Sequence, residues 1–256
     1  MDLATPVGVI LGFAVVIVAN IMEGGHPSSL FLIPPMLLVF GGTLMATIAG
    51  GTMADAKTAV KSLKRAFTGK VAPAGDLVPH IITLAERARR EGLLALEDAL
   101  RDIEDPFLVK GVTMAIDGTD PDELRDILEA EVHAKKAEDK QAAKFYTDAG
   151  GYAPTVGIIG TVMGMVHVLE NLTTPAALGP LIAGAFVATL WGVGSANLLF
   201  LPLGSRLKRL GALEAARMEL TVEGISAIQS GSNPRLVAEK LKSLLPADQQ
   251  NAEEAA

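Results

Sequence analysis

The positively charged residues of this chain are confined to two blocks. All 22 Lys and Arg residues lie within 57–144 and 206–242. Two long segments, 1–56 and 145–205, contain none, are mostly apolar, and are each long enough to cross a bilayer twice. A helical span needs roughly 20 apolar residues, and basic residues stay on the cytoplasmic side of the membrane. The pattern therefore predicts location, topology and orientation together.

Composition argues against several other classes of protein. Half of the residues are hydrophobic, a share that soluble domains rarely combine with such long uncharged runs. The net charge of −7 argues against a nucleic-acid partner. The absence of cysteine excludes disulfides and thiol chemistry, and the four scattered histidines show no metal-binding pattern. We expect no cofactor.

Four membrane spans are predicted. The connectors at 23–28 and 170–175 are short and lack basic residues, so both should lie outside the cytoplasm. The N-terminus lacks the basic region of a signal peptide and is expected to be a retained helix. Both termini and the long middle segment should then be cytoplasmic. The predicted spans are 6–22, 30–50, 153–169 and 180–203.

The predicted fold class is an all-α membrane protein, with a helical cytoplasmic domain between the second and third of four transmembrane helices. The expected divisions are a first transmembrane hairpin at 1–56, a cytoplasmic helical domain at 57–148, a second hairpin at 149–204, cytoplasmic C-terminal helices at 205–245, and a disordered tail at 246–256.

Several cytoplasmic helices follow from periodicity and capping signals. The basic amphipathic stretch 57–67 is expected to continue the second span beyond the membrane surface. Further helices are expected at 77–91 and 93–103. Another should start at Asp120-Pro121 and run to about residue 148.

The third span carries small and hydroxyl residues. Gly160 and Gly164 have GxxxG spacing, with Gly157 on much the same face, a pattern that favours tight helix packing. Thr161 and Thr189 are the most notable polar residues at membrane depth. Each hydroxyl could satisfy a carbonyl of its own helix, or offer oxygen to a cation or a water chain. The spacing alone leaves both alternatives open.

Other positions admit two interpretations. Pro154 could kink a helix or occupy its first turn, whereas Pro202 lies near the cytoplasmic end of the fourth span. The stretch 86–97 is charged on one side and apolar on the other, which fits either a solvated face or a partner surface. Glu97 and Arg101 have the spacing of an ordinary helical ion pair.

The chain resembles the MotA/PomA family, the channel subunit of the bacterial flagellar motor stator. APTVGIIGTVMGMVHVLENL (153–172) and LGPLIAGAFVATLWGVGSANLLFLPL (178–203) look like the third and fourth spans of that family. GISAIQSGSNPRLVAEKLKSLLP (224–246) is similar to its C-terminal signature, and RREGLLALEDALRDIEDPF (89–107) resembles its rotor-facing loop.

The resemblance implies roles for matching residues. Arg89 and Glu97 correspond to the family's charged pair that meets the rotor protein FliG, and Arg90 is a neighbouring candidate. Pro154 and Pro202 match prolines linked to conformational coupling. Thr161 and Thr189 match threonines that line the ion path of sodium-type stators.

The resemblance also implies partners. The apolar runs contain no carboxylate, and an ion path typically needs one, so it must come from another chain. In the family it belongs to a peptidoglycan-anchored MotB/PomB-type subunit, surrounded by a pentameric ring of the A subunit. The transported ion would be H⁺ or Na⁺, and the location the lipid bilayer of the bacterial inner membrane.

Three alternatives remain. An ExbB/TolQ-type energiser shares the ion-driven mechanism, but those proteins have three spans, whereas this chain has apolar runs at both 6–22 and 30–50. A structural membrane scaffold would tolerate changes at Thr161 and Glu97. An enzyme is the weakest alternative, because the sequence contains no nucleotide loop, nucleophile elbow or metal-spaced His cluster.

Overall fold

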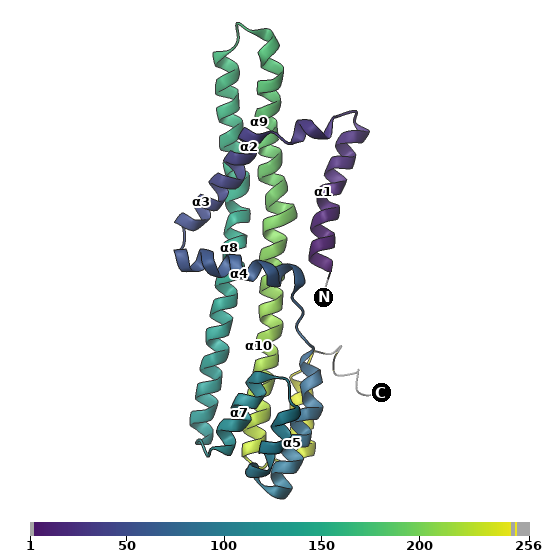
Figure 1. Cartoon of the computed structure of the whole chain (residues 1–256), viewed down its shortest axis with the longest axis vertical. Helices are drawn as coiled ribbons and strands as arrows, with labels where there is room; N and C mark the ends of the chain where they lie inside the picture. Colours follow the sequence, from purple (N-terminus) through teal and green to yellow (C-terminus); the bar gives the residue numbers. More distant parts are fainter. Residues whose placement is uncertain (1–2, 247–248, 250–256) are drawn as a thin grey trace. The chain divides into compact units, whose positions relative to one another are not determined.

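The computed structural model describes residues 3–246 and 249, and these contain helices and turns but no strand. The chain divides into two compact units. The first comprises Met1–Lys70 and Asp139–Arg209, and the second comprises Val71–Glu138 and Leu210–Ala256. Two helices, α8 (Pro121–Glu170) and α10 (Leu201–Gln229), contribute to both units (Figure 1). The predicted all-α class is confirmed.

The first unit contains the apolar helices. Within the described residues, three helical stretches are long and apolar enough to cross a membrane: α1 (Ala4–Met22), α8, and the stretch Pro175–Gln229. The last joins α9 (Pro175–Ser195), the π-helical turn η6 (Ala196–Phe200) and α10. The second predicted span corresponds to a shorter apolar segment, Ile33–Ala49, so four spans remains a prediction.

The second apolar segment is not one regular helix. A 3₁₀ turn, η1 (Pro27–Leu30), is followed by α2 (Ile33–Met36), the π-helical turn η2 (Leu37–Gly41) and α3 (Gly42–Ala49). Proline fits the first helical turn, where its missing N–H costs nothing, and Pro34-Pro35 directly follow Ile33, the first residue of α2. The π-helical turn widens the helix at its middle.

The expectation that 57–67 continues the second span is wrong. Helix α3 ends at Ala49, and a separate helix, α4 (Met53–Thr68), begins after a short turn. Thr52 and Asp55 form a capping box: Asp55 N–H donates to Thr52 Oγ1 at 3.2 Å, and Thr52 N–H donates to Asp55 Oδ2 at 2.8 Å. A capping box satisfies the free donors of a new helix start, which explains the break.

The predicted third span and the helix predicted before it form one continuous helix. Helix α8 runs for 50 residues from a charged first half into an apolar second half. Asp120 accepts hydrogen bonds from the N–H groups of Asp122 and Glu123, at 3.0 and 3.3 Å, which confirms the expected start. Pro154 lies inside this helix, so its placement in a first turn is wrong.

The second unit has a conventional aliphatic core. It is built from α5 (Val78–Glu91), α7 (Pro106–Ile116), α11 (Pro234–Ser243) and the parts of α8 and α10 in this unit. The helix expected at 93–103 is instead three short turns: η4 (Leu93–Ala95), α6 (Leu96–Ala99) and η5 (Leu100–Asp102). Leu96 is fully buried and anchors these turns in the core.

One further short turn, η3 (Ala74–Leu77), leads into α5. The tail predicted to be disordered, 246–256, lies mostly outside the described residues, since 247–248 and 250–256 are not described.

Candidate functional site

Helices α8 and α9 lie side by side in the first unit and approach closely through small residues (Figure 1). A Cβ added to Gly192 would lie 2.8 Å from the carbonyl oxygen of Ala153 and 2.9 Å from the Cα of Gly157. A Cβ on Gly164 would lie 2.6 Å from the Cβ of Ala185. The tight packing predicted from the glycine spacing is therefore confirmed, because the glycines let the two helix backbones approach closely.

This close approach places the two predicted threonine hydroxyls against each other. Thr161 Oγ1, on α8, hydrogen bonds with Thr189 Oγ1 on α9. The Thr161 hydroxyl also lies 3.1 Å from the Gly157 carbonyl of its own helix and 3.1 Å from the Ala185 carbonyl of α9. Both threonines are half-buried. The Thr161 hydroxyl therefore contacts both a carbonyl of its own helix and polar atoms of α9, so it bridges the two helices.

The pair offers hydroxyl oxygens at the depth of the apolar segments, but no charge. Asp, Glu, Lys and Arg are absent from 149–169 and 171–205. Among the described residues, no group of three or more His, Asp or Glu side chains could hold a metal ion. Hydroxyl and carbonyl oxygens can solvate a passing cation or order water, whereas holding one and releasing it usually needs a carboxylate.

The two predicted prolines flank a contact between α8 and α10. Pro154 has no N–H to donate to the carbonyl of Gly150, one turn earlier on α8. A Cβ on Gly150 would lie 2.5 Å from Cδ2 of Leu201, the residue before Pro202. Pro202 itself follows the π-helical turn η6. Both prolines thus weaken the backbone ladder where α8 and α10 touch.

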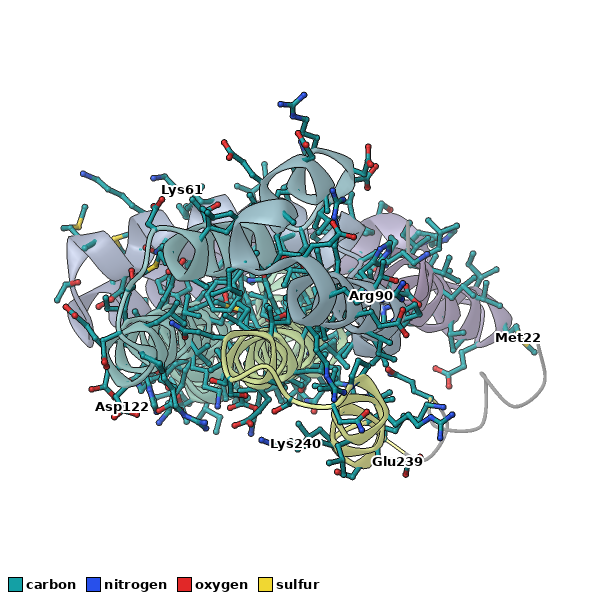
Figure 2. The ribbon with its side chains drawn as sticks, turned by 90° about the horizontal axis from the view of Figure 1, so that it is seen from below. Met22, Lys61, Arg90, Asp122, Glu239 and Lys240 are labelled. Atoms are coloured by element: carbon teal, nitrogen blue, oxygen red, sulfur yellow. The ribbon has the colours of Figure 1, made fainter. Side chains whose placement is uncertain are left out.

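The charged candidates lie in the second unit. Arg89 and Arg90 end α5, and Glu97 is on α6; all three side chains are exposed. Arg90, labelled in Figure 2, pairs with Glu86 at 3.3 Å, an exposed contact of little energetic weight. Arg89 and Glu97 form no ion pair with another described side chain.

The backbone near these charged residues depends on Gly92, and one nearby ion pair differs from the predicted one. Gly92, at φ 87°, turns the chain sharply after α5, a conformation that side chains with a Cβ disfavour. The predicted helical pair of Glu97 with Arg101 is not formed. Arg101 instead lies 3.4 Å from Asp98, because the chain around it winds as short turns.

A second pair of threonines was not among the predicted site residues. Thr43 and Thr47 on α3 are buried, and the Thr47 hydroxyl donates to the Thr43 carbonyl at 2.8 Å. The buried Thr43 Oγ1 has no partner among the described residues. Two threonines one turn apart in an apolar run were the available signal.

The lone tryptophan packs on the first unit. The Trp191 ring lies 5.5 to 5.8 Å, centroid to centroid, from the rings of Phe13, Phe31 and Phe40, and its indole N–H donates to the Leu30 carbonyl at 2.6 Å. Aromatic contacts of this kind join α1 and the second apolar segment to α9.

Two family models match the chain: the model for the MotA/TolQ/ExbB proton channel family at residues 99–220, and the one for the motility protein A N-terminal region at residues 6–92. Motility protein A of Bacillus subtilis is 34% identical over 96% of this chain and 92% of its own length. The chain belongs to the motility protein A family.

Solved structures agree with this family assignment. The C. jejuni MotAB structure superposes with a TM-score of 0.91 at 32% identity, covering 97% of both chains. The flagellar MotAB stator complex from Bacillus subtilis matches with a TM-score of 0.88 at 33% identity, covering 96% of this chain and 98% of that one. The match at 6–92 covers both apolar runs that argued against an ExbB/TolQ-type protein, and the family supports the stator interpretation over that alternative.

Proposed function

We propose that this chain is the ring-forming channel subunit of a flagellar motor stator, coupling ion flow across the inner membrane to rotation. The observation that carries the proposal is the Thr161–Thr189 hydroxyl pair between α8 and α9, inside apolar segments without a carboxylate. A subunit that lines an ion path without binding the ion by charge needs polar oxygens along the path but no charged side chain. The family and the MotAB structures that this chain resembles support this function.

The ion-binding carboxylate would come from a MotB/PomB-type, peptidoglycan-anchored partner. The structures that match this chain are of MotAB complexes, which supports such a partner. Within its apolar segments this chain has no carboxylate that could bind a proton or a sodium ion and release it. The role proposed for Thr161 and Thr189 is therefore to solvate the ion as it reaches or leaves the carboxylate of the partner.

The proposed ring would be a homo-oligomer, in the family a pentamer. Several large apolar side chains on the outer half of α8 are exposed in the single chain, among them Ile158, Ile159 and Val162. These side chains can face lipid, a neighbouring copy or the partner helix. The proposal keeps the predicted topology, with four spans and both termini in the cytoplasm, and an activity that is transport and torque rather than catalysis.

The coupling step is assigned to Pro154 and Pro202. A helix with a missing backbone hydrogen bond bends at lower cost than a regular one. The contact of Gly150 with Leu201 lets a change in α8 reach the start of α10. The output surface would be Arg89, Arg90 and Glu97, which would meet the rotor protein FliG through exposed charge.

The first test concerns the path. Thr161→Val keeps the side-chain shape but removes the hydroxyl, so we expect torque and ion-dependent swimming speed to fall several-fold. The matched control is Thr155→Val on the same helix, where the hydroxyl is exposed and donates only to the Tyr152 carbonyl. Cells lacking their own stator would carry each variant with its partner, and proton and sodium gradients would be collapsed separately. Unchanged torque for Thr161→Val would remove Thr161 from the path.

The second test concerns the output surface. Glu97→Lys should lower torque while ion conductance stays at the wild-type value, because Glu97 lies outside the apolar segments. Glu138→Lys makes the same charge change at another exposed site of the second unit and serves as control. The loss should vary with salt, since exposed charges are screened over about 8 Å at physiological ionic strength. Equal torque loss in both variants would contradict a specific rotor contact.

A further inference from the structure

Helix α4 packs one face against the rest of the first unit, and its opposite face is exposed among the described residues. On the packed face, Ala59 and Ala66 are buried, and the Tyr146 hydroxyl of α8 donates to the Ala59 carbonyl at 2.8 Å. Arg65 of α4 forms a two-pronged ion pair with Asp139 of α8, of which the Nη2–Oδ2 contact measures 3.3 Å. The helix is therefore held firmly in one rotation about its axis.

The opposite face combines exposed lysines with exposed apolar side chains. Lys57, Lys61 and Lys64 are all exposed, and Figure 2 labels Lys61 on the outward side of α4. Beside them, Met53 and Val60 are 65% and 71% exposed. Met53, Val60 and the lysines 57 and 64 recur at spacings of three, four and seven residues, which places them on one side of the helix.

This outward face carries no compensating negative charge. Asp55 is the only acidic residue of α4, and its carboxylate is used in the capping box with Thr52. The hydrogen bond from the Thr52 side chain lowers the pKa of Asp55, so it remains an anion that serves the helix start. The three lysines therefore present a purely positive row next to apolar side chains.

The position of α4 in the first unit matches the edge of the apolar segments. Three residues separate its start from the end of α3 at Ala49, and a Cβ on Gly50 would lie 3.5 Å from the hydroxyl of Tyr152, near the start of the apolar half of α8. Figure 1 shows α4 running across α8 rather than along it. A helix that crosses a membrane-spanning helix in this way would lie roughly in the plane of the membrane surface.

We infer that α4 is a docking helix for anionic phospholipid, with Lys57, Lys61 and Lys64 binding headgroup phosphates while Met53 and Val60 enter the acyl boundary. Basic residues beside apolar ones on one helix face are the chemistry of membrane-surface helices. Each lysine near an anionic surface strengthens attraction roughly fivefold. This inference does not depend on ion transport and goes beyond the proposed stator function.

The first experiment measures lipid choice directly. The full-length protein is purified in detergent with equal amounts of phosphatidylglycerol and phosphatidylcholine, and the retained lipids are counted by native mass spectrometry. We expect wild type to retain mainly phosphatidylglycerol, and Lys57→Gln/Lys61→Gln/Lys64→Gln to lose that preference at least tenfold, as should wild type in high salt. Lys110→Gln/Lys136→Gln/Lys240→Gln removes equal charge from the second unit and should keep the preference.

The second experiment locates the contact and keeps the inference testable if the triple variant misfolds. The chain has no cysteine, so Val60→Cys supplies one site for a fluorescent label. In proteoliposomes, brominated phosphatidylglycerol should quench this label more strongly than brominated phosphatidylcholine, whereas a label at Asp122→Cys in the second unit should be quenched by neither. Equal quenching by both lipids would overturn the inference, leaving only apolar contact. No quenching at Val60→Cys would also overturn it and point to a second copy of the chain covering this face.

Discussion

Different kinds of side chain stabilise the interior of each of the two units. Of the twelve largest fully buried side chains among the described residues, only Leu203 and Leu207 belong to the first unit; the others, such as Leu108, Leu128 and Ile225, belong to the second. The first unit instead joins α8 and α9 through glycine, alanine and threonine. Water drives large apolar groups into a core, whereas lipid gives no such drive and favours close backbone contact. The difference indicates the solvent that each unit has evolved to face.

The largest expected effect comes from emptying the core of the second unit. Leu128 is fully buried, and Leu128→Ala should lower the free energy of unfolding by about 2–5 kcal/mol, since the deleted side-chain atoms leave a cavity that the surrounding structure fills only in part. Thermal unfolding of the full-length protein in detergent, followed by circular dichroism, would measure it. Leu94→Ala, at a side chain that is 75% exposed, is the control and should change stability by less than about 0.5 kcal/mol.

The next largest effect is expected from a substitution that disrupts the close contact between α8 and α9 in the first unit. Gly192→Ala places a Cβ against two backbone atoms of α8, so the helices must separate, at a cost of about 1–3 kcal/mol. Gly194→Ala is its matched control on the same helix, because no atom lies within 4 Å of the added Cβ. The apparent melting temperatures of the two variants would be compared, and equal values would contradict a backbone-limited contact.

A glycine in the second unit sharpens this comparison. A Cβ on Gly111 would lie 2.2 Å from Cδ1 of Ile225 and 3.1 Å from Cδ1 of Leu128. These atoms are the ends of side chains that can rotate, whereas the obstacles at Gly192 are backbone. We therefore expect Gly111→Ala to lower the melting temperature less than Gly192→Ala, and the reverse order would show that the core of the second unit is the more rigid one.

Arg217 is the next most sensitive position, and it tests how charge supports the second unit. Its Nε donates to Asp105 Oδ2 at 2.9 Å, and its Nη1 donates to the Pro73 carbonyl at 3.0 Å. Asp105 also caps α7 through the N–H of Leu108 at 3.0 Å. Arg217→Ala should cost about 1.5–3 kcal/mol, the range for hydrogen bonds to charged groups. Its control, the exposed Arg235→Ala, should unfold at the same temperature as wild type.

The smallest expected effect is a pH dependence in the second unit. A hydrogen bond from Lys240 lowers the pKa of Glu223, helped by Arg125 and opposed by burial. A carboxylate with a lowered folded pKa stabilises the protein above its unfolded pKa of about 4.3, and that stability is lost as the pH falls through the folded value. Glu223→Gln should thus be less stable than wild type near neutral pH, by no more than about 1 kcal/mol because the partners are largely exposed.

Stability measured from neutral to acidic pH would test this linkage. The gap between wild type and Glu223→Gln should close as the pH drops below about 4.3. A gap that stays constant with pH would assign the loss to packing rather than charge.

Much of the architecture followed from local patterns in the sequence. The apolar runs predicted the membrane-type helices, and the Asp120-Pro121 signal predicted the start of α8, because capping and hydropathy depend on nearby residues. The errors arose where neighbouring segments compete. The basic stretch after the second apolar run begins a new helix through the Thr52–Asp55 capping box. The stretch at 93–103 forms short turns instead of one regular helix, and these turns bury Leu96 in the core.

The candidate site shows the same division between sequence and tertiary structure. The sequence by itself determined which residues could act: uncharged apolar segments, glycines at helical spacing, two threonines and a block of charge. Only the folded structure shows that Thr161 meets Thr189, that Gly150 packs against Leu201, and that α4 turns its lysines outward. Residue type and local pattern can be read from neighbouring positions in the sequence. These contacts join positions far apart in the chain, and only the packing of whole helices fixes which faces meet.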